Sequence, residues 1–459
     1  MTRSIVIVGA GPAGLSAAIE AVRHNCDVTL IDEGVQPGGQ IYRQRPAGLV
    51  GREYAEPGEL ARKDALLQRF AQVRGSIDYR SETSVFSVFG NREVHVSRGG
   101  STEVLRPDAI ILATGVREMA LPFRNWTLPG VMFAGGAQAV LKAHDVLPGR
   151  RAVVAGSGPL PLVVAAQIIR AGGEVAALAM LHGPGAMLRH PLGLWHGRGV
   201  LREGLRYGAT VLRSGTPRLT GYVPIEAHGD RQVEGVTLAR VAHDGGIEPG
   251  THKHIACDLV AVNYGFLANS ELAAMAGAAM RYDPLIGGWL PVTDDAGRTS
   301  VAGIYAAGDG AGLRGALVAE ADGLVTAAAA CEADAASLHA ALALRRRHEA
   351  FQPAVRQLLP LPPQLWAMIE PETIICRCET VRMAEIDQAL GEGHRTLNAI
   401  KRNTRAGMGW CQGRNCLHAI SARCAARTGA PPSTMMTPRP LARPVTLAAL
   451  AQQVKAASP

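Results

Sequence analysis

The chain has 459 residues, enough for two or three domains that each bury a hydrophobic core. It is 47% hydrophobic but only 4% aromatic and contains 53 glycines, which indicates a glycine-punctuated α/β protein and argues against the aromatic platform on which single-stranded nucleic acid stacks. The net charge of +8 comes mainly from scattered arginines, with one run at residues 345–347, so we expect no nucleic-acid partner.

No signal peptide precedes the first predicted strand, which begins at Ser4. Residues 152–169 are uncharged and apolar, but they include two glycines and two prolines, so they predict a buried strand and turn rather than a transmembrane segment. We therefore expect a cytoplasmic protein whose contact with the inner membrane, where there is one, is made through a complex.

A first nucleotide site is predicted at the N-terminus. The apolar run at residues 4–8 is typical of a buried parallel strand, a glycine-rich turn follows, and a second strand at residues 28–31 leads to Asp32. The glycines permit close approach of a pyrophosphate to a helix N-terminus, and the acid can bind ribose hydroxyls. The cofactor contacts predicted here are Gly9, Gly11, Pro12, Ala13, Gly14, Asp32 and Glu33.

Later segments resemble the flavin-binding motifs of thioredoxin-reductase-like flavoproteins. Residues 38–40 resemble the segment beside the isoalloxazine, although a plain glycine turn is the alternative. Residues 109–115 resemble the strand end that closes the first domain, and residues 301–310 resemble the second FAD motif, whose aspartate binds the ribityl chain; a helix N-cap is the alternative for that aspartate. The FAD contacts that this resemblance implies are Gly39, Gln40, Val85, Thr114, Gly115 and Asp309.

A second dinucleotide fold is predicted between these motifs. A strand at residues 151–155, a glycine-rich turn at 156–161 and a strand at 174–180 repeat the first pattern. However, Pro161 replaces the third glycine and removes an N–H group, and Ala179 stands where an acid would bind the NAD ribose. We therefore expect weak or absent use of NAD(P).

The cysteines divide into two groups. Disulfide reductases of this architecture carry a closely spaced cysteine pair beside the flavin, and no such pair stands in the flavoprotein part of this sequence. Cys26, Cys257 and Cys331 stand alone and are predicted to be buried packing residues. A dithiol relay is therefore not expected.

Four of the other five thiols form two close pairs, and Cys424 stands outside them. Cys376 and Cys378 make a C-x-C motif, and Cys411 and Cys416 make a C-x4-C motif, which together suit a [2Fe–2S] cluster or a tetrahedral zinc. Three glycines surround the second pair: Gly407, Gly409 and Gly413. Because glycines let backbone N–H groups point at sulfur, they favour the cluster as the metal site, and a zinc knuckle stays the alternative.

The spacing of these cysteines and the run at residues 407–416 resemble the bacterioferritin-associated-ferredoxin-like (BFD-like) [2Fe–2S] module. That module is fused to the larger subunit of flavin-dependent amine dehydrogenases and oxidases, a group that includes subunits of opine oxidase, hydrogen cyanide synthase and hydroxyproline dehydrogenase. Within the module we predict a helix at residues 382–390 and another after Cys416.

Other segments connect these parts. Residues 315–344 are rich in alanine and predict one long helix. Residues 352–363 contain four prolines and predict a stiff joint. Residues 431–444 contain five prolines and predict an extended arm that either wraps a partner or stays mobile.

The predicted fold class is α/β, with two Rossmann-like dinucleotide-binding domains, the second inserted in the first, and a small helical C-terminal [2Fe–2S] domain. The predicted parts are an FAD-binding domain at 1–125 and 260–345, a degenerate NAD(P)-binding-like domain at 126–259, a linker at 346–365, the BFD-like domain at 366–430 and a proline-rich arm at 431–459.

The resemblance implies an electron-transfer subunit of a heteromeric dehydrogenase or oxidase of an amino acid or secondary amine, of the opine, proline, hydroxyproline or glycine type. A smaller FAD-containing partner would oxidise the substrate, and a quinone or another carrier would accept the electrons; FMN at a subunit boundary and a small third subunit stay open. No candidate general base stands out, so no catalytic residue is assigned. The alternatives are a stand-alone NAD(P)H-dependent reductase of a one-electron acceptor and a non-catalytic scaffold.

Overall fold

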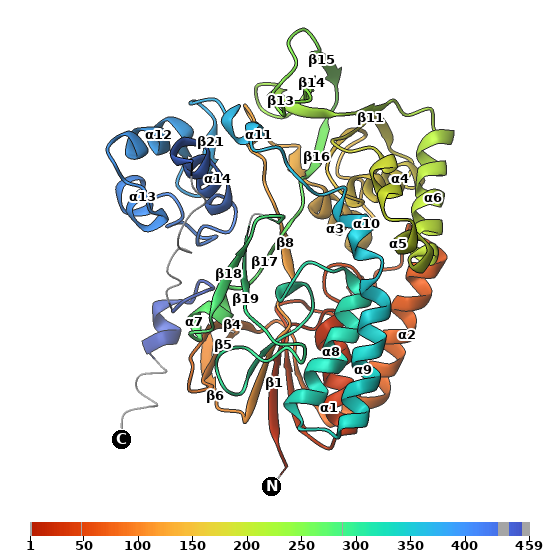
Figure 1. Ribbon diagram of the computed structural model, residues 1–459, viewed down its shortest axis with the longest axis vertical. Helices are drawn as coiled ribbons and strands as arrows, with labels where there is room; N and C mark the ends of the chain where they lie inside the picture. Colours follow the sequence, from red (N-terminus) through yellow and green to blue (C-terminus); the bar gives the residue numbers. More distant parts are fainter. Residues whose placement is uncertain (1, 47, 287, 430–439, 452–459) are drawn as a thin grey trace.

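The structure is a computed structural model that describes all residues except 1, 47, 287, 430–439 and 452–459. It contains two five-stranded parallel sheets (Figure 1). The chain leaves the first sheet, builds the second and returns to add the last strand of the first. The predicted insertion of one Rossmann-like fold in another is therefore confirmed.

The first sheet is buried on both faces. Its order is β20-β7-β1-β2-β3, with strands at Ile304–Ala306, Ala109–Leu112, Ser4–Val8, Asp27–Ile31 and Ile77–Arg80. Ile5 and Ile7 of β1 pack with helices α1 and α8, whereas Val6 and Val8 pack against the antiparallel sheet β4-β5-β6. Two covered faces explain why this strand is apolar throughout instead of alternating. The elements around the sheet are α1 (Pro12–Arg23), α2 (Pro57–Val73), η1 (Arg74–Ser76), β4 (Ser84–Val88), β5 (Val94–Arg98) and β6 (Ser101–Leu105).

The second sheet is also buried on both faces. Its order is β12-β11-β10-β16-β9, with strands at Arg218–Thr220, Glu174–Met180, Arg151–Gly156, Leu259–Asn263 and Val131–Phe133. Ala152 and Val154 face helices α3, α4 and α6, and Val153 and Ala155 face the opposite core. The surrounding elements are α3 (Ala134–His144), α4 (Leu160–Arg170), η2 (Pro184–Arg189), α5 (Pro191–His196), α6 (Arg198–Arg213), β13 (Tyr222–His228), β14 (Gly235–Arg240) and β15 (Lys253–Ala256).

Two short strands join the folds. The chain passes from the first fold to the second through β8 (Val116–Glu118) and returns through β17 (Phe266–Ala268), and these two strands pair with each other. The return leads into α7 (Glu271–Met275), β18 (Met280–Asp283), β19 (Gly288–Pro291) and η3 (Gly308–Gly310). We call the β8–β17 pair the hinge.

The prediction of one helix over residues 315–344 is wrong. Two helices occur, α8 (Ala316–Ala330) and α9 (Ala335–Glu349), and they pack against each other. Glu332 adopts a left-handed conformation with φ of 56°, which ends the first helix, and the Asp334 carboxylate accepts a hydrogen bond from Ser337 N at 2.8 Å, which starts the second. A local cap therefore outweighs the alanine propensity.

The predicted stiff joint at 352–363 is partly helical and packs on the second fold. It contains α10 (Gln352–Arg356) and runs along the second fold to α11 (Gln364–Ala367). His182 of the second fold contacts Pro360 O at 2.7 Å. The prolines shape this segment, but contacts with the second fold fix its path.

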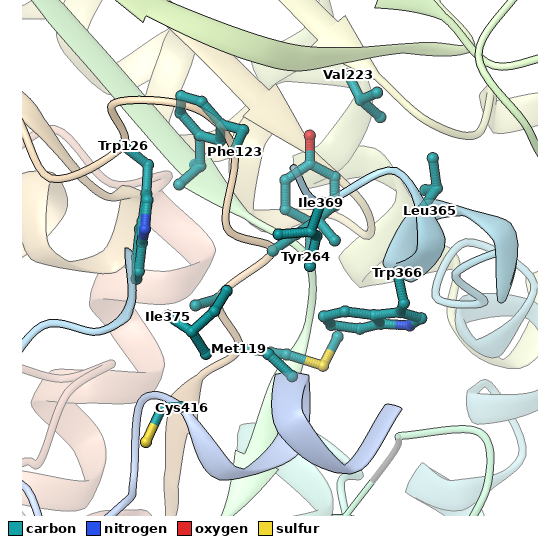
Figure 2. Close-up of a cluster of buried hydrophobic side chains, with 14 of the residues drawn as sticks. Met119, Phe123, Trp126, Val223, Tyr264, Leu365, Trp366, Ile369, Ile375 and Cys416 are labelled. Atoms are coloured by element: carbon teal, nitrogen blue, oxygen red, sulfur yellow. The ribbon is translucent and has the colours of Figure 1, made fainter. Parts of the chain in front are cut away.

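The cysteine module packs on the second fold. It comprises β21 (Ile374–Cys376), β22 (Val381–Arg382), α12 (Met383–Gly391), α13 (Leu397–Thr404) and α14 (Leu417–Thr428), so both predicted helices are confirmed. Figure 2 shows Trp126 and Met119 of the flavoprotein part beside Ile375 and Cys416 of the module, and these side chains share one core. Trp126 Nε1 also donates to Ile374 O at 2.6 Å. The module is therefore held in a defined position.

The predicted arm lies partly outside the described residues. In its described part, Ala442 N donates to Phe86 O at 2.6 Å, and Arg443 pairs with Glu33. Farther on, Thr102 Oγ1 donates to Ala449 O at 3.0 Å. This part packs on the first fold of its own chain, so the mobile state is wrong for it, and contact of the arm with a partner stays a prediction. No helix among the described residues is long and apolar enough to cross a bilayer.

Two helical glycines test the packing of α8 against α1. A methyl group at Gly323 in α8 would lie 2.1 Å from Ala13 O in α1, whereas one at Gly204 in α6 would meet no atom within 4 Å. We expect Gly323→Ala to lower the free energy of unfolding by about 1–3 kcal/mol, because the two helices must separate. We expect Gly204→Ala to raise it by about 0.5–1 kcal/mol. Urea unfolding followed by circular dichroism measures both, and equal effects would contradict the packing.

Candidate functional site

The first glycine turn has the shape that a dinucleotide requires. Gly9 has a φ of 108°, and an added Cβ would lie 2.4 Å from Ala113 O. A Cβ on Gly14 would lie 1.7 Å from Gly9 O, so this glycine permits close packing of helix and strand. Gly11, by contrast, has only Gly39 Cα nearby, at 3.9 Å from an added Cβ. The turn is therefore packed closely against the protein at Gly9 and Gly14, and it is open at Gly11.

Asp32 follows β2 and contacts the same turn. Its carboxylate accepts hydrogen bonds from Ala10 N at 2.5 Å and from Gly34 N at 2.6 Å, one on each oxygen. Burial raises the pKa of Asp32, and these two N–H groups oppose that effect. Each oxygen keeps capacity for a second bond, so the side chain can hold the turn and still accept from ribose hydroxyls. Neighbouring Glu33 instead pairs with Arg443 of the arm, with a contact of 3.0 Å.

The predicted FAD contacts line one cavity of about 2350 Å³, well above the usual size of a ligand pocket. The residues brought together there are Gly9, Gly11, Pro12, Ala13, Asp32, Glu33, Gly39, Gln40, Val85, Thr114, Gly115 and Asp309. Gly14 alone of the set does not line it, because its role is helix packing. Among the described residues, no cysteine lines this cavity.

Asp309 lies in η3 beside the start of α8. Its Oδ1 accepts hydrogen bonds from Arg314 N at 2.9 Å and from Gly315 N at 2.8 Å. Burial raises the pKa of this carboxyl. Both bonds use Oδ1, so Oδ2 keeps its capacity for a ligand hydroxyl. Gly315 is the N-cap of α8 and no side chain caps it, so the N-cap alternative for Asp309 is wrong, and the ribityl-binding role stays a prediction.

The isolated cysteines differ from prediction in one respect. Cys257 is buried as expected, but Cys26 and Cys331 are only half-buried, and their thiols contact each other at the ends of α1 and α8. The sequence separates them by some three hundred residues, so only the packing of α1 on α8 brings them together. Neither residue lines the cavity, so this pair is not a relay beside it.

The four module cysteines lie as two pairs. The Cys416 thiol hydrogen-bonds Cys376, which lowers the pKa of Cys376 to about 6 with help from backbone N–H groups, and Cys378 contacts Cys411. The N–H groups that point at the Cys376 sulfur belong to Cys378, Glu379 and Gly407. In the described part of the chain, no three His, Cys, Asp or Glu side chains converge as a site for a single metal ion. The two pairs are close enough to act on each other electrostatically, as the four ligands of one [2Fe–2S] cluster or one tetrahedral zinc must be.

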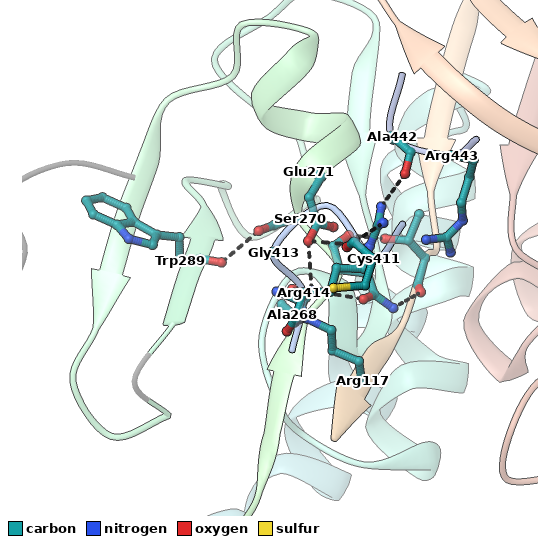
Figure 3. A network of polar contacts seen from close by, with 12 residues as sticks. Arg117, Ala268, Ser270, Glu271, Trp289, Cys411, Gly413, Arg414, Ala442 and Arg443 are labelled. Atoms are coloured by element: carbon teal, nitrogen blue, oxygen red, sulfur yellow. Dashed lines mark hydrogen bonds and ion pairs between the residues drawn. The ribbon is translucent and has the colours of Figure 1, made fainter. Parts of the chain in front are cut away.

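The C-x4-C loop contacts the hinge (Figure 3). Arg117 of β8 donates to Arg414 O at 3.1 Å and pairs with Glu271 at 2.8 Å. Arg414 Nη2 donates to Ala442 O at 2.7 Å, so the cluster loop also holds the arm. Burial lowers the pKa of Arg414, and the Glu271 carboxylate opposes that effect. Arg414 and Asn415 line the cavity that holds the predicted FAD contacts.

Sequence reasoning missed two residues at the hinge. Arg117 carries no motif, and its role emerges only from the contact with Arg414. Glu118 lines the cavity and accepts a hydrogen bond from Gly135 N at the start of α3. Burial raises the pKa of Glu118 to about 7. No local pattern distinguishes these two from ordinary surface charges, because β8 is only three residues long.

In the second turn, one assignment shifts by a residue. The strand register is irregular between Ala152 and Val153, so Gly156 lies opposite Met180. In the first fold Val8 pairs with Ile31, which puts Gly9 level with Asp32. The structural equivalent of Asp32 is therefore Met180, and the prediction of Ala179 is wrong by one position. A carboxylate is absent at either residue, so the expected loss of ribose recognition is unchanged.

Comparison with known proteins identifies both parts. A family model described as pyridine nucleotide-disulphide oxidoreductase matches residues 3–330, and a BFD-like [2Fe-2S] binding domain matches residues 374–422. These families imply FAD and an iron–sulfur cluster. The residues present fit both groups, since Gly9 and Gly11 form a cradle that a Cβ would fill and backbone N–H groups surround the Cys376 sulfur.

Several relatives match nearly the whole chain. An opine oxidase subunit of Rhizobium meliloti is 34% identical over 98% of this chain and 87% of its own. The hydrogen cyanide synthase subunit HcnB of Pseudomonas aeruginosa is 32% identical over 92% of this chain and 93% of its own. The crystal structure of L-proline dehydrogenase from P. horikoshii shares the fold, with a TM-score of 0.71 and 22% identity over 98% of this chain and 79% of that one. The chain therefore belongs to the pyridine nucleotide-disulphide oxidoreductase family and carries a BFD-like [2Fe-2S] binding domain in addition.

Proposed function

We propose that this chain is the electron-transfer subunit of a heteromeric flavin-dependent dehydrogenase or oxidase of an amino acid or secondary amine. The carrying observation is that the C-x4-C loop lies on the hinge and that Arg414 lines the same cavity as Gly11 and Asp309. Flavin exchanges two electrons with organic donors whereas a [2Fe–2S] cluster takes one, so a chain that holds both links two-electron to one-electron chemistry.

Several residues give this proposal a physical basis. Arg117 presents donors to the backbone on both sides of the hinge, at Ala268 O and Arg414 O. Trp126 anchors the strand that leads to Cys376. These contacts keep the thiol pairs at a fixed position beside the cavity, which electron transfer between two bound groups requires.

The relatives support a partner chain and an amine substrate. Both of the whole-chain relatives described above are named as subunits, and one of them is named for opines. In the proposed complex a smaller FAD-containing chain oxidises the amine, and this chain passes the electrons to a quinone or another carrier. The same proposal includes an FMN at the boundary between the chains and a small third subunit.

Co-purification at native expression levels tests the proposal. We expect a flavin-containing partner to co-purify, and we expect one amine among opines, glycine, proline and hydroxyproline to bleach the flavin absorbance of the complex. We expect stoichiometric NADH to leave it unchanged, because the second turn lacks a ribose-binding acid. Purification as a lone chain whose flavin is bleached at once by NADH would overturn the proposal.

Substitution of one ligand tests the cluster. Cys416 is buried and contacts Cys376, whereas Cys424 is a buried cysteine of the same module outside the motif. We expect Cys416→Ser to lose most iron and acid-labile sulfide, because one iron then lacks a thiolate. We expect Cys424→Ala to retain both. Zinc instead of iron in the wild-type protein would rule out the cluster.

Arg414 offers a test with a spectroscopic readout. Its guanidinium lies within the ligand loop and is largely buried. Removing a positive charge near a cluster favours its oxidised form, so we expect Arg414→Gln to lower the cluster potential by on the order of tens of millivolts. Arg414→Lys should restore much of it, and Arg382→Gln, at an exposed ion pair of the same module, should leave it unchanged. A redox titration followed by EPR measures all three, and identical potentials would contradict the placement.

A further inference from the structure

The two glycine turns have similar sequences but different surroundings. In the first, an added Cβ at Gly11 would meet only Gly39 Cα, at 3.9 Å. In the second, an added Cβ at Gly158 would lie 3.0 Å from Leu359 Cδ2 of the linker. The middle glycine is the one that lets a pyrophosphate approach the backbone. The linker therefore covers the point of approach in the second fold, and in the first fold none of the described residues covers it in the same way.

The linker also takes up the hydrogen-bond donors of the second turn. Gly158 N donates to Leu358 O at 2.9 Å, and the buried Ser157 hydroxyl donates to the same oxygen. A carbonyl oxygen thus receives the two donors that a phosphate oxygen would otherwise take. Proline at 161 supplies no N–H to the following turn of helix, so the remaining donor set is small.

A third contact of the linker lies where a dinucleotide-binding fold recognises the ribose. His182, just beyond β11, contacts Pro360 O at 2.7 Å through Nε2. The end of this strand is where a carboxylate binds ribose in a nucleotide-binding fold. Leu358, Leu359 and Pro360 therefore lie along the path from the pyrophosphate position toward the ribose position, and they satisfy protein groups at both ends.

We propose that the second dinucleotide fold binds the linker of its own chain, centred on Leu358–Pro360, in place of a pyridine nucleotide. The fold then acts as a socket that fixes the segment leading to the cysteine module. Because the linker is covalently attached, its effective concentration is in the millimolar range or above, so a free nucleotide competes poorly. This inference concerns the second fold alone and stands whether or not the electron-transfer proposal holds.

The linker is also held by contacts on both sides of the turn. Upstream, α10 packs against α5 and η2 of the second fold. Downstream, α11 packs against α14 of the module, whose His418 contacts Ala120 O at 2.6 Å. A segment that is held before and after the turn cannot leave it without breaking these contacts as well. The docked linker is thus part of the native packing.

The experiment uses the full-length protein with its cofactors. A combined Leu358→Gly and Leu359→Gly variant removes the side chains that cover the turn. Gln357→Gly is the matched control, because that side chain hydrogen-bonds Pro353 O of the preceding helix and not the second turn. Hydrogen exchange of the Gly158 amide reports the bond directly, and trypsin cleavage after Arg356 reports release of the linker. We expect the double variant to raise both rates roughly tenfold or more, and the control to leave them unchanged.

Binding of NADH completes the test. We expect no saturable binding of NADH to the wild-type protein up to about 1 mM by equilibrium dialysis. Saturable binding that accelerates cleavage after Arg356 would overturn the proposal, as would Gly158 exchange in the wild type as fast as in the double variant. Should the double variant fail to fold, Ser157→Ala removes a single donor to Leu358 O and is expected to raise the same two rates by a smaller factor.

Discussion

One guanidinium joins the three parts of this molecule. Arg117 lies in the hinge, and it donates to Ala268 O on the returning strand, to Arg414 O in the cluster loop and to the carboxylate of Glu271. Lysine could not make this set, because it lacks the planar array of five N–H donors. The side chain is only about a quarter exposed, so its loss would remove a donor from two carbonyl oxygens in a largely dry environment and would leave the Glu271 carboxylate paired with Arg414. The relative position of cavity and thiol pairs depends on it.

Local patterns predicted the parts of the structure that are determined locally. The strand at Glu174–Met180 and the turn at Gly9 depend on neighbouring residues, so apolar runs and glycine spacing were sufficient. The cysteine pairs could be predicted equally well, since their spacing along the chain limits which sulfur atoms can lie together. The break after α8 also had a local signal. Asp334 stands three residues before Ser337, the spacing of a helix N-cap, but the high alanine content of the segment favoured one continuous helix.

The features that the sequence did not reveal depend on contacts between distant segments. The pairing of Arg443 with Glu33, the docking of the linker on Gly158 and the meeting of Cys26 with Cys331 each join residues that are far apart in the sequence. An extra residue in β11, Ala176, which has no partner in β10, moved the expected acid position by one residue, and no composition rule reveals such a shift. Prolines predicted a stiff joint, but Pro353 lies inside the helix α10, and prolines could not indicate which surface the segment would contact.

The state of the second turn bears on the direction of electron flow. Reductases of this architecture receive a hydride from a pyridine nucleotide bound at this turn, next to the flavin. Here Leu358 O already accepts from Gly158 N, and Met180 stands in place of the acid. A chain that keeps the fold but blocks the donor site needs another source of electrons, and among its described residues no dithiol lies beside the cavity. In the proposed complex, a partner chain that oxidises an organic substrate supplies that source, so the covered turn and the proposed complex support each other while resting on different residues.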